Sequence, residues 1–295
     1  EVEDLWQNQI LWETIILSLT SELFYHYKYT DHYKLIQYAS GQNMLKYATL
    51  SKIPDLKFSD FGTRRRFSGA WQKDVVGIMK SLPNFTGTSN VRLAMDLNIP
   101  VVGTNAHEMY MVASGMWREQ LRESWDMILD DWEDVHPDKL ICLTDTFGTK
   151  QFFEDFGLER AKKWTGVRHD SGDPFTFGEN VISWYEGMGI DPKSKIIVFS
   201  DGLTLDKMLA LYERFNGRIK ITFGWGTHLT NDTGAVTLSI VMKVIEVISV
   251  NGILLNNKLV KLSDNLNKST GTEEDKALYV ETFGYINSDR EDTIV

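Results

Sequence analysis

The sequence predicts a mixed α/β protein built mainly as an irregular, TIM-like α/β barrel, with a smaller α/β domain only partly present. Short apolar runs that end in Gly, Asp, Ser or Thr alternate with segments of helical periodicity, which is typical of parallel β/α units. At least six such units occur, which favours a barrel over an open sheet. An Asn-Gly pair at 251–252 lies between two apolar runs and predicts a hairpin outside the barrel.

The predicted strands are short, and each comes just before a polar cluster. These strand-and-cluster segments are KFSDFGTRRR (57–66), IPVVGTNAHE (99–108), KLICLTDTFG (139–148), KKWTGVRHDSGDP (162–174), KIIVFSDGLT (195–204) and RIKITFGWGTHLTND (218–232). Amphipathic helices are predicted between them, for example over 68–82 and 204–217. Thr204 and Gly217 suit the two ends of the second helix, because threonine caps N-termini and glycine ends helices.

Both ends of the chain are predicted to lie outside the barrel. Residues 1–20 form a linking helix, residues 21–234 the barrel, and residues 235–295 a segment returning to the smaller domain, β-rich over 236–265. Glu13 and Glu22 interrupt the apolar N-terminal segment, which excludes a membrane span there. A largely buried helix is predicted from its apolar residues Ile10, Leu11, Ile15, Leu17 and Leu19.

Net charge limits the kind of ligand the protein can bind, and cysteine content bears on disulfides and the cellular compartment. The net charge of −10 argues against a nucleic-acid binder, which usually carries a basic face. Three consecutive arginines, Arg64 to Arg66, therefore form a local cluster that suits a small anion. Cys142 is the single cysteine, so no disulfide can form within the chain, which fits a reducing cytoplasm. It is expected to be a small buried apolar residue.

The polar residues at the predicted strand ends suit a phosphorylated ligand. Arginine forks bind carboxylate or phosphate, and glycine-rich turns that open a helix present N–H groups to phosphate. Such turns occur at FSDGLT (199–204) and GWGTH (224–228). Aspartates from neighbouring strands, such as Asp145, Asp170 and Asp201, can hold Mg²⁺ or sugar hydroxyls. The set suggests a phosphorylated sugar, a small anion and Mg²⁺.

Ordered motifs give a more specific resemblance. They are DFGTRRRFS (60–68), GTSN (87–90), GTNAHE (103–108), LTDTFGT (143–149), GVRHDSGDP (166–174), FSDGL (199–203), FGWGTHLTND (223–232) and KLSDN (261–265). From about residue 10 to about residue 270, the chain resembles the nicotinate phosphoribosyltransferases. The resemblance implies the barrel of the type II phosphoribosyltransferases, assembled as a homodimer with shared active sites. It also implies an entry step of NAD salvage, in which nicotinate and phosphoribosyl pyrophosphate give nicotinate mononucleotide and pyrophosphate with hydrolysis of ATP.

The resemblance also implies roles for individual residues. His107 corresponds to the histidine that ATP phosphorylates, and Phe61 to the aromatic that stacks on the pyridine ring. Arg64 and Arg168 are expected to bind the nicotinate carboxylate and nearby phosphates. For Arg65, a pyrophosphate contact and a structural role both remain open, as they do for the neighbouring Arg66.

The remaining site residues are expected to bind the sugar, the phosphates and the metal ion. Asp170 and Asp173 are expected to bind ribose hydroxyls and Mg²⁺, and His107, Asp170 and Arg168 form the catalytic set. Further substrate contacts are assigned to Arg65, Thr88, Ser89, Ser171, Gly172, Asp201, Gly202, Gly224, Gly226 and Thr227. Ser89 stands where the related nicotinamide-specific enzymes carry an aspartate. A serine can donate to a carboxylate that an aspartate would repel, so the acid is favoured over the amide.

Two departures and three alternatives accompany this assignment. The chain begins after a region that carries a Thr-Asp-x-Tyr-Lys motif in the family; TDHYKL (30–35) resembles it only superficially, so Tyr33 is not expected to stack on the substrate. Trp225, between two glycines, is expected to narrow or line the phosphate loop.

The alternatives are a nicotinamide-type enzyme, a quinolinate-type enzyme and a truncated, non-catalytic subunit. Ser89 argues against the nicotinamide-type enzyme, and GTNAHE argues against the quinolinate-type enzyme.

Overall fold

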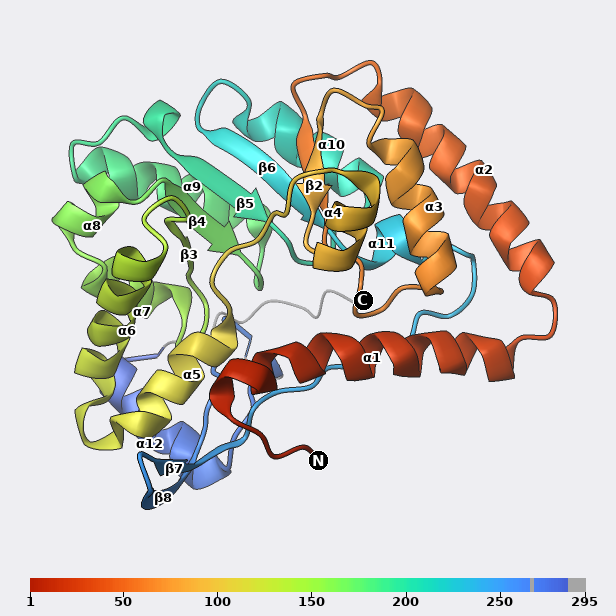
Figure 1. Cartoon of the computed structure of the whole chain (residues 1–295). Coiled ribbons are helices and arrows are strands. Elements are labelled where there is room, and N and C mark those ends of the chain that lie inside the picture. The colour runs from red at the N-terminus through yellow and green to blue at the C-terminus, as the bar shows by residue number, and fades with distance from the viewer. Residues whose placement is uncertain (266–267, 286–295) are drawn as a thin grey trace.

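A parallel sheet surrounded by helices forms the centre of the molecule (Figure 1). The computed structural model describes residues 1–265 and 268–285. Its six-stranded sheet has the order β2-β1-β6-β5-β4-β3, with every neighbouring pair parallel. The strands are β1 (Lys57–Asp60), β2 (Phe85–Thr88), β3 (Ile141–Leu143), β4 (Gly166–His169), β5 (Ile196–Phe199) and β6 (Lys220–Trp225). The predicted α/β class is confirmed, and β2 is a strand that the sequence analysis did not predict.

The helices lie on the outside of the sheet (Figure 1). They are α1 (Trp6–Lys28), α2 (His32–Leu50), α3 (Gly69–Met79), α4 (Val91–Leu97), α5 (His107–Met116), α6 (Leu121–Val135), α7 (Thr149–Asp155), α8 (Leu158–Lys163), α9 (Pro174–Gly187), α10 (Leu205–Phe215), α11 (Thr227–Thr230) and α12 (Glu273–Phe283), with 3-10 turns η1 (Arg118–Gln120) and η2 (Pro192–Ser194). The predicted cap of α10 is confirmed, because Thr204 accepts a hydrogen bond from the Lys207 N–H. No helix among the described residues is both long and apolar enough to cross a membrane.

One side chain connects the segment that follows β2 to the other edge strand of the sheet, β3. After β2, Val101 makes a single parallel bridge to Thr88. The next residues carry the chain toward β3, where the Asn105 Oδ1 atom accepts a hydrogen bond of 3.0 Å from the Leu143 N–H. This seam between residues 101–105 and β3 therefore depends on a side chain in place of a backbone ladder.

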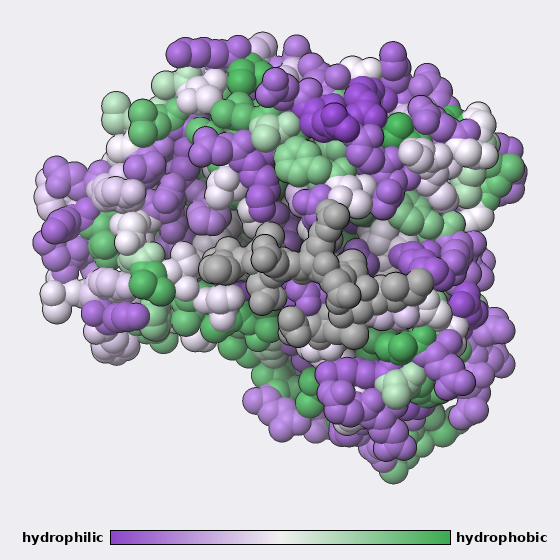
Figure 2. All heavy atoms as spheres, turned by 180° about the vertical axis from the view of Figure 1, so that it is seen from behind, coloured by the Kyte–Doolittle hydropathy of each residue, from purple (hydrophilic) through white to green (hydrophobic). Residues whose placement is uncertain are grey.

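A hairpin lobe projects from the rest of the molecule (Figures 1 and 2). Strands β7 (Glu246–Val250) and β8 (Ile253–Lys258) pair antiparallel around Asn251 and Gly252. Both turn residues have positive φ, 51° and 81°, as the Asn-Gly hairpin requires. Val247 and Leu259 pack with Met111 of α5 in a small apolar cluster separate from the main core. The predicted hairpin is confirmed.

The prediction of β structure is wrong for residues 236–245, which form no strand. Their backbone groups bond to side chains of α1 and of the arginine loop. The Tyr25 hydroxyl accepts from the Leu238 N–H at 3.0 Å, and the Ile240 carbonyl accepts from Arg65 Nε at 3.2 Å. These partners replace a neighbouring strand, so the segment runs as an irregular strap.

Helix α1 is not the largely buried helix that its composition predicted. Leu17 is buried, but Leu11 and Leu19 are more than half exposed, and Ile10 and Ile15 are also exposed. The apolar residues surround the helix instead of forming one stripe, so only one side of it can pack against the chain described here. The helix continues through the expected boundary at residue 20 to Lys28 (Figure 1).

The main core lies between the sheet and its helices. Fully buried aromatic residues dominate it, including Phe58, Phe199, Phe223 and Trp164. Cys142 is also fully buried, as expected, and burial raises the pKa of its thiol to about 12. This packing holds the strand ends, and therefore the loops that follow them, in fixed positions.

Candidate active site

The loops that carry the sequence-predicted residues all follow the carboxyl ends of neighbouring strands. Parallel strands present these ends at one edge, which is where α/β enzymes place their sites. The residues that follow the strands are Phe61 and Arg64 to Arg66 after β1, Thr88 and Ser89 at the end of β2, His107 after the 101–105 segment, Asp145 after β3, Asp170 to Asp173 after β4, Asp201 and Gly202 after β5, and Gly226 and Thr227 after β6.

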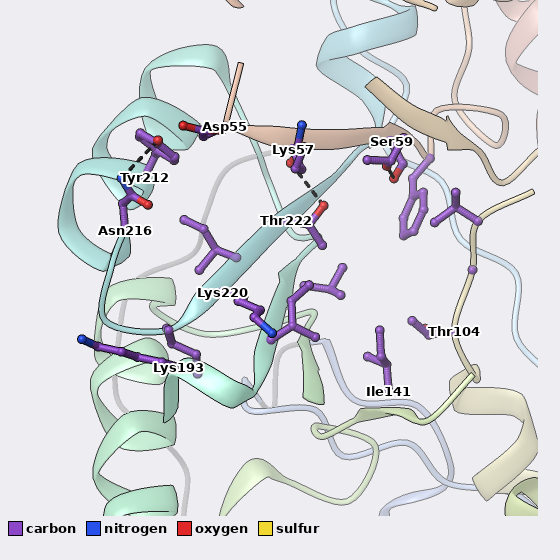
Figure 3. Close-up of a pocket in the computed structure, with 18 of the residues that line it drawn as sticks. Asp55, Lys57, Ser59, Thr104, Ile141, Lys193, Tyr212, Asn216, Lys220 and Thr222 are labelled. Atoms are coloured by element: carbon purple, nitrogen blue, oxygen red, sulfur yellow. Dashed lines mark hydrogen bonds between the residues drawn. The ribbon is translucent and has the colours of Figure 1, made fainter. Parts of the chain in front are cut away.

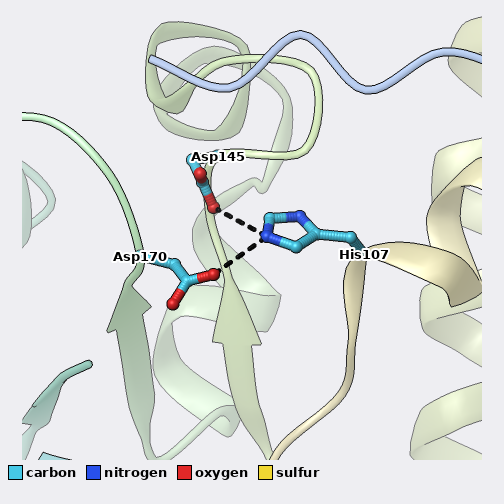
Figure 4. Close-up of side chains that lie close together, drawn as sticks. All are labelled: His107, Asp145 and Asp170. Carbon is cyan, nitrogen blue, oxygen red and sulfur yellow. Dashed lines mark hydrogen bonds and ion pairs between the residues drawn. The ribbon is translucent and has the colours of Figure 1, made fainter. Parts of the chain in front are cut away.

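His107 stands at the centre of a hydrogen-bonded group (Figure 4). It is the first residue of α5 and is only 5% exposed. Its Nε2 atom lies 3.0 Å from Asp170 Oδ2 and 3.8 Å from Asp145 Oδ1. Its Nδ1 atom lies 3.0 Å from the Thr146 hydroxyl. Both ring nitrogens therefore have a partner, and the two partners differ in kind.

Burial fixes the protonation state of this imidazole. It lowers the pKa of His107 to about 4, and the nearby Lys261 ammonium acts in the same direction, although Asp145 and Asp170 oppose it. At neutral pH the ring is therefore uncharged, with a proton on one nitrogen and a lone pair on the other. The Thr146 hydroxyl can either donate or accept, so it fits both tautomers, whereas a carboxylate favours the proton on Nε2.

Asp170 and Asp145 remain ionised beside the imidazole. Burial opposes ionisation, but Arg168 and the His107 hydrogen bond hold the pKa of Asp170 well below its usual range. Ser200 donates to Asp170 at 2.8 Å, and Ser171 donates to Asp145 at 2.6 Å. Two anionic groups thus face one ring nitrogen in a site that is largely closed to water.

This donor set fits a divalent cation. Among the described residues, His107, Asp145 and Asp170 each offer a ligand atom, and these atoms lie within 4.8 Å of one another. Asp145 Oδ1 is buried and has no hydrogen-bond partner in the described part of the chain, so a lone pair is available there. Because Mg²⁺ prefers oxygen ligands, the two carboxylates fit it better than the imidazole does. Asp173 lies outside this group and caps α9, accepting from the Thr176 N–H at 2.7 Å.

Arg168 joins this group from β4. Its Nη2 atom lies 3.4 Å from Asp170 Oδ2, and its Nη1 atom donates to the Thr104 hydroxyl at 2.8 Å. Its Nε atom has no partner among the described residues. The guanidinium therefore lies beside the Asp170 carboxylate and retains capacity to bind an anion.

The arginine loop is held by groups of the protein itself. Arg64 Nη1 lies 2.6 Å from Glu13 Oε1 of α1, and Arg66 contacts Glu22 of the same helix. Burial opposes it, but Glu13 and, at longer range, Asp170 raise the pKa of Arg64. Arg64 is still 43% exposed, so its guanidinium remains accessible while paired. Arg66 contacts Glu22 and Gln72, so its described contacts, like the Glu13 contact of Arg64, are with the protein itself.

Phe61 lies against the glycine of β6. A Cβ atom on Gly224 would stand 2.4 Å from Phe61 Cδ2, so only glycine leaves room for the ring. Phe61 is partly exposed at the upper end of an internal cavity. Gly224 therefore positions the aromatic and does not itself present a free surface to a ligand.

A buried carboxylate that the sequence analysis overlooked organises two loops. Asp60 is fully buried at the end of β1, and burial raises its pKa. It accepts from the Thr88 hydroxyl at 2.7 Å and from Gln72 at 2.8 Å, and its carbonyl accepts from the Ser89 N–H. Thr88 thus uses its hydroxyl inside the protein, whereas the Ser89 side chain is exposed.

The glycine-rich turn after β6 is supported from below. Trp225 is fully buried, and its indole N–H donates to the Leu203 carbonyl at 2.9 Å. The expectation that it lines the loop is wrong, because its ring packs into the core behind the loop. The Lys46 ammonium lies 5.3 Å from this ring, bonds to the His228 carbonyl and pairs with Asp232 at 2.8 Å.

Three further residues expected to contact the ligand, and Tyr33, which was not, have the following surroundings. Asp201 lies 3.4 Å from Lys268. Gly202 has a φ of +52°, which favours glycine there. Gly172 also has positive φ, at +80°, in the turn before Asp173. Tyr33 is 76% exposed on α2, where Asp31 caps the helix, so TDHYKL serves as a helix start.

Several residues that the structure places in the site have no predicted role from the sequence. Thr146 and Lys261 belong to the quoted motifs LTDTFGT and KLSDN, so the signal was present without a role. The Leu262 N–H donates to the Thr146 carbonyl at 2.8 Å, which brings KLSDN over the site. Asp264 there accepts from Thr149, and burial raises its pKa to about 6. These contacts join residues more than a hundred positions apart, which no local pattern reveals.

Comparisons with known proteins agree on one family. The model of the nicotinate phosphoribosyltransferase (NAPRTase) family matches residues 56–287. The chain is similar to the crystal structure of nicotinate phosphoribosyltransferase from Porphyromonas gingivalis, with 35% identity and a TM-score of 0.84 over 93% of this chain and 70% of that one. It is also similar to the enzyme of that name from Vibrio cholerae, with 32% identity and a TM-score of 0.85 over 96% of this chain and 69% of that one.

Proposed function

Because this chain belongs to the nicotinate phosphoribosyltransferase family, we propose that it joins nicotinate to phosphoribosyl pyrophosphate, releasing pyrophosphate and forming nicotinate mononucleotide. The reaction is coupled to ATP hydrolysis through a phosphohistidine and supplies NAD salvage. The observation that carries the proposal is the buried, uncharged His107 held between Thr146 and Asp170 at the strand ends.

The geometry supports His107 as the phosphoryl acceptor. In the tautomer with the proton on Nδ1, the Thr146 hydroxyl accepts that proton's hydrogen bond, and the Nε2 lone pair faces the site. Nε2 forms a bond to the γ-phosphorus of ATP as the bond to the ADP oxygen breaks. The ring then carries a positive charge, which Asp145 and Asp170 stabilise. No proton has to leave the ring during this step.

The same groups suit the sugar transfer. The bond from the anomeric carbon to pyrophosphate breaks before the new bond to the pyridine nitrogen is complete, so positive charge develops on the ribose. The Asp170 carboxylate stabilises that charge, and Arg168 binds the departing anion. We propose that Asp145 and Asp170 hold Mg²⁺, which would supply further positive charge beside the pyrophosphate. Asp173 remains a proposed ribose contact.

Nicotinate is favoured over nicotinamide by the residues near the base. The exposed Ser89 can donate to a carboxylate, Arg64 supplies positive charge, and Phe61 offers a ring face for stacking. We propose that the remaining contacts to the sugar and phosphates come from the loops after β1, β4, β5 and β6, at Arg65, Ser171, Gly172, Asp201, Gly202, Gly226 and Thr227.

We also propose a cytoplasmic homodimer with shared active sites. The single cysteine, which leaves no disulfide within the chain, supports the compartment. The exposed apolar residues of α1, next to the Glu13–Arg64 pair, support a partner surface near the site. Light scattering on the purified chain, followed by mixing two inactive variants, tests whether two copies complete one site.

Labelled ATP tests the proposal directly. The protein is incubated with γ-labelled ATP, Mg²⁺, phosphoribosyl pyrophosphate and either nicotinate or nicotinamide, with His107→Ala as the matched variant. We expect mononucleotide from nicotinate alone, acid-labile label on the wild type and neither label nor ATP coupling in the variant. Product from nicotinamide would contradict the substrate assignment. A folded chain that takes no label and makes no product would favour a non-catalytic subunit.

A further inference from the structure

The interior of the barrel is hollow. A cavity of about 620 Å³ lies within it, a volume typical of small-molecule sites (Figure 3). Bulky branched side chains fill the interior of most α/β barrels in layers. Here small hydroxyl residues occupy interior positions, and the hydroxyls of Ser59 and Thr86 bond to each other at 2.8 Å. Thr222 of β6 lines the same space, which we call the lumen.

The upper end of the lumen reaches the candidate active site. Phe61 and Thr104 line this end. The Thr104 hydroxyl accepts from Arg168, which in turn lies beside Asp170. A molecule in the lumen could therefore place one end against the Phe61 ring, at the boundary of the reaction site.

The lower end is open at the amino ends of the strands and carries positive charge. Lys57, Lys193 and Lys220 line the part of the lumen nearest these amino ends, with one acid, Asp55; all four are labelled in Figure 3. Lys57 donates to two backbone carbonyls and is therefore engaged. Lys193 and Lys220 are exposed, and neither forms an ion pair with another described residue. An anionic group would be favoured at this mouth.

The length and the walls of the lumen define the shape of an occupant. Along β6, Gly224 lies beside Phe61 and Lys220 lies at the mouth. These two positions are four residues apart, which is about 13 Å along a strand. Ile196 and Val198 of β5 line the path between the two ends. The space therefore suits a ring at one end, an apolar chain between and an anion at the other end.

We propose that the lumen binds arylalkanoates, with the aromatic ring against Phe61, the methylene chain along Ile196 and Val198 and the carboxylate at Lys220. The aromatic face of Phe61, the apolar walls and the unpaired lysine each select one part of such a molecule. Competition between this ligand and nicotinate rests on the proposed function, whereas binding to the lumen does not.

Calorimetry with ω-phenylalkanoates of increasing chain length tests the proposal on the full chain. We expect affinity to rise by about fourfold per methylene until the carboxylate reaches Lys220, because each buried methylene adds apolar contact. Lys220→Gln should weaken binding of the longest acid by about fivefold and leave its methyl ester unchanged. Lys34→Gln, on the outer surface of α2, is the matched control and should change neither. Affinity that does not depend on chain length would overturn the proposal, as would equal effects of the two lysine variants.

A variant whose side chain fills the lumen gives a second, independent test of arylalkanoate binding. Thr222→Phe should abolish binding of the long acids, whereas Thr222→Val, which keeps the side-chain volume, should preserve it. A folded Thr222→Phe protein that still binds would overturn the proposal, and if this variant does not fold, the lysine variants decide the outcome. Nicotinate should displace the long acids, and simultaneous binding of both would overturn the continuity with the Phe61 site. Nicotinate turnover, measured separately on the wild type, tests the proposed function alone, so the two failures are distinguishable.

Discussion

The Thr146 hydroxyl can accept the Nδ1 proton of His107 and so supports the tautomer in which Nε2 carries the reactive lone pair. This hydroxyl contacts Nδ1, whereas Asp170 contacts Nε2. A valine at position 146 has the same shape but cannot accept the Nδ1 proton, so the tautomer with a free Nε2 lone pair loses its partner. We expect Thr146→Val to slow label incorporation from ATP by about tenfold, equivalent to about 1.4 kcal/mol of barrier.

Thr282→Val is the control for this experiment, because the Thr282 hydroxyl bonds only to the backbone of α12 among the described residues. Rapid-quench measurement of acid-labile label would separate the two variants. Unchanged labelling in Thr146→Val would mean that the hydroxyl does not set the tautomer.

Glu108, next to His107 in sequence, is expected to make the stability of the folded protein depend on pH. Burial, with a further contribution from Glu13, raises its pKa from 4.5 to about 7, and Lys243 only partly opposes this. At pH values between 4.5 and about 7, Glu108 keeps its proton in the folded protein and releases it in the unfolded chain. Raising the pH through this range therefore lowers the free energy of unfolding, by up to about 3 kcal/mol for this group alone.

Glu108→Gln removes that ionisable group. We expect the variant to match the wild type in urea denaturation at about pH 4 and to exceed it by about 1–3 kcal/mol at about pH 8. Glu281→Gln, which alters an exposed acid on α12, should show no such difference. A variant that is less stable than the wild type at pH 8 would show that the carboxylate is favourable when ionised.

The residues proposed for the reaction could be predicted from sequence more readily than the groups that hold them in place. Arg168 lies near the end of β4, Asp170 directly follows that strand and His107 follows the 101–105 segment, all inside short motifs, so position and chemistry both pointed to them. The partner of Arg64 is Glu13, which lies 51 residues earlier on α1. Such a pair arises only when the helix packs across the loop, and no spacing rule in the sequence describes that contact.

At the scale of elements, α2 supports the glycine-rich turn through one buried lysine. Lys46 is 4% exposed and connects the His228 carbonyl, Asp232 and the Trp225 ring. Lys46→Met should lower the free energy of unfolding by about 1–3 kcal/mol, because Asp232 and the carbonyl lose their partner. Since the turn is a proposed phosphate site, the KM for phosphoribosyl pyrophosphate should rise more than kcat falls.

Lys34→Met on the same helix is the control, since Lys34 is exposed. Urea denaturation and steady-state kinetics on both variants would check this expectation. An unchanged KM together with reduced stability would limit Lys46 to a structural role.

The prediction of elements succeeded where the apolar pattern was strong and failed where packing decides. Strand β2 has the sequence Phe-Thr-Gly-Thr, which carries too little apolar character to stand out from a loop. Helix α1 was expected to be largely buried because it is rich in leucine and isoleucine, yet composition does not say which sides have a neighbour. The 236–245 strap bonds to side chains, and no periodicity predicts that arrangement.

At the scale of the whole molecule, the hairpin lobe meets the barrel at a close contact with α5. A Cβ atom on Gly115 of this helix would lie 2.2 Å from Leu259 and 3.0 Å from Val247. Gly115→Val should therefore push the lobe away from α5. We expect faster hydrogen exchange in β7 and β8 with little change in the strands of the barrel.

Gly77→Val on α3 is the matched control, because it also replaces a helical glycine and a Cβ atom there would have no neighbouring group of the described chain within 4 Å. Exchange mass spectrometry on both variants would compare the lobe with the barrel. Equal acceleration throughout the molecule would mean that lobe and barrel unfold as one unit.

The hydrogen bond between Asn105 and Leu143 makes exchange of the Leu143 amide proton a measure of local opening at this seam. The Leu143 N–H bonds to the Asn105 side chain, so a single rotation about a side-chain torsion releases it without the loss of any strand pair. Its exchange should be faster than that of the amides within β4 and β5, and Asn105→Ala should accelerate it further. The Asn105 contact can therefore open while every paired strand of the sheet stays joined, and this first opening would lie beside His107.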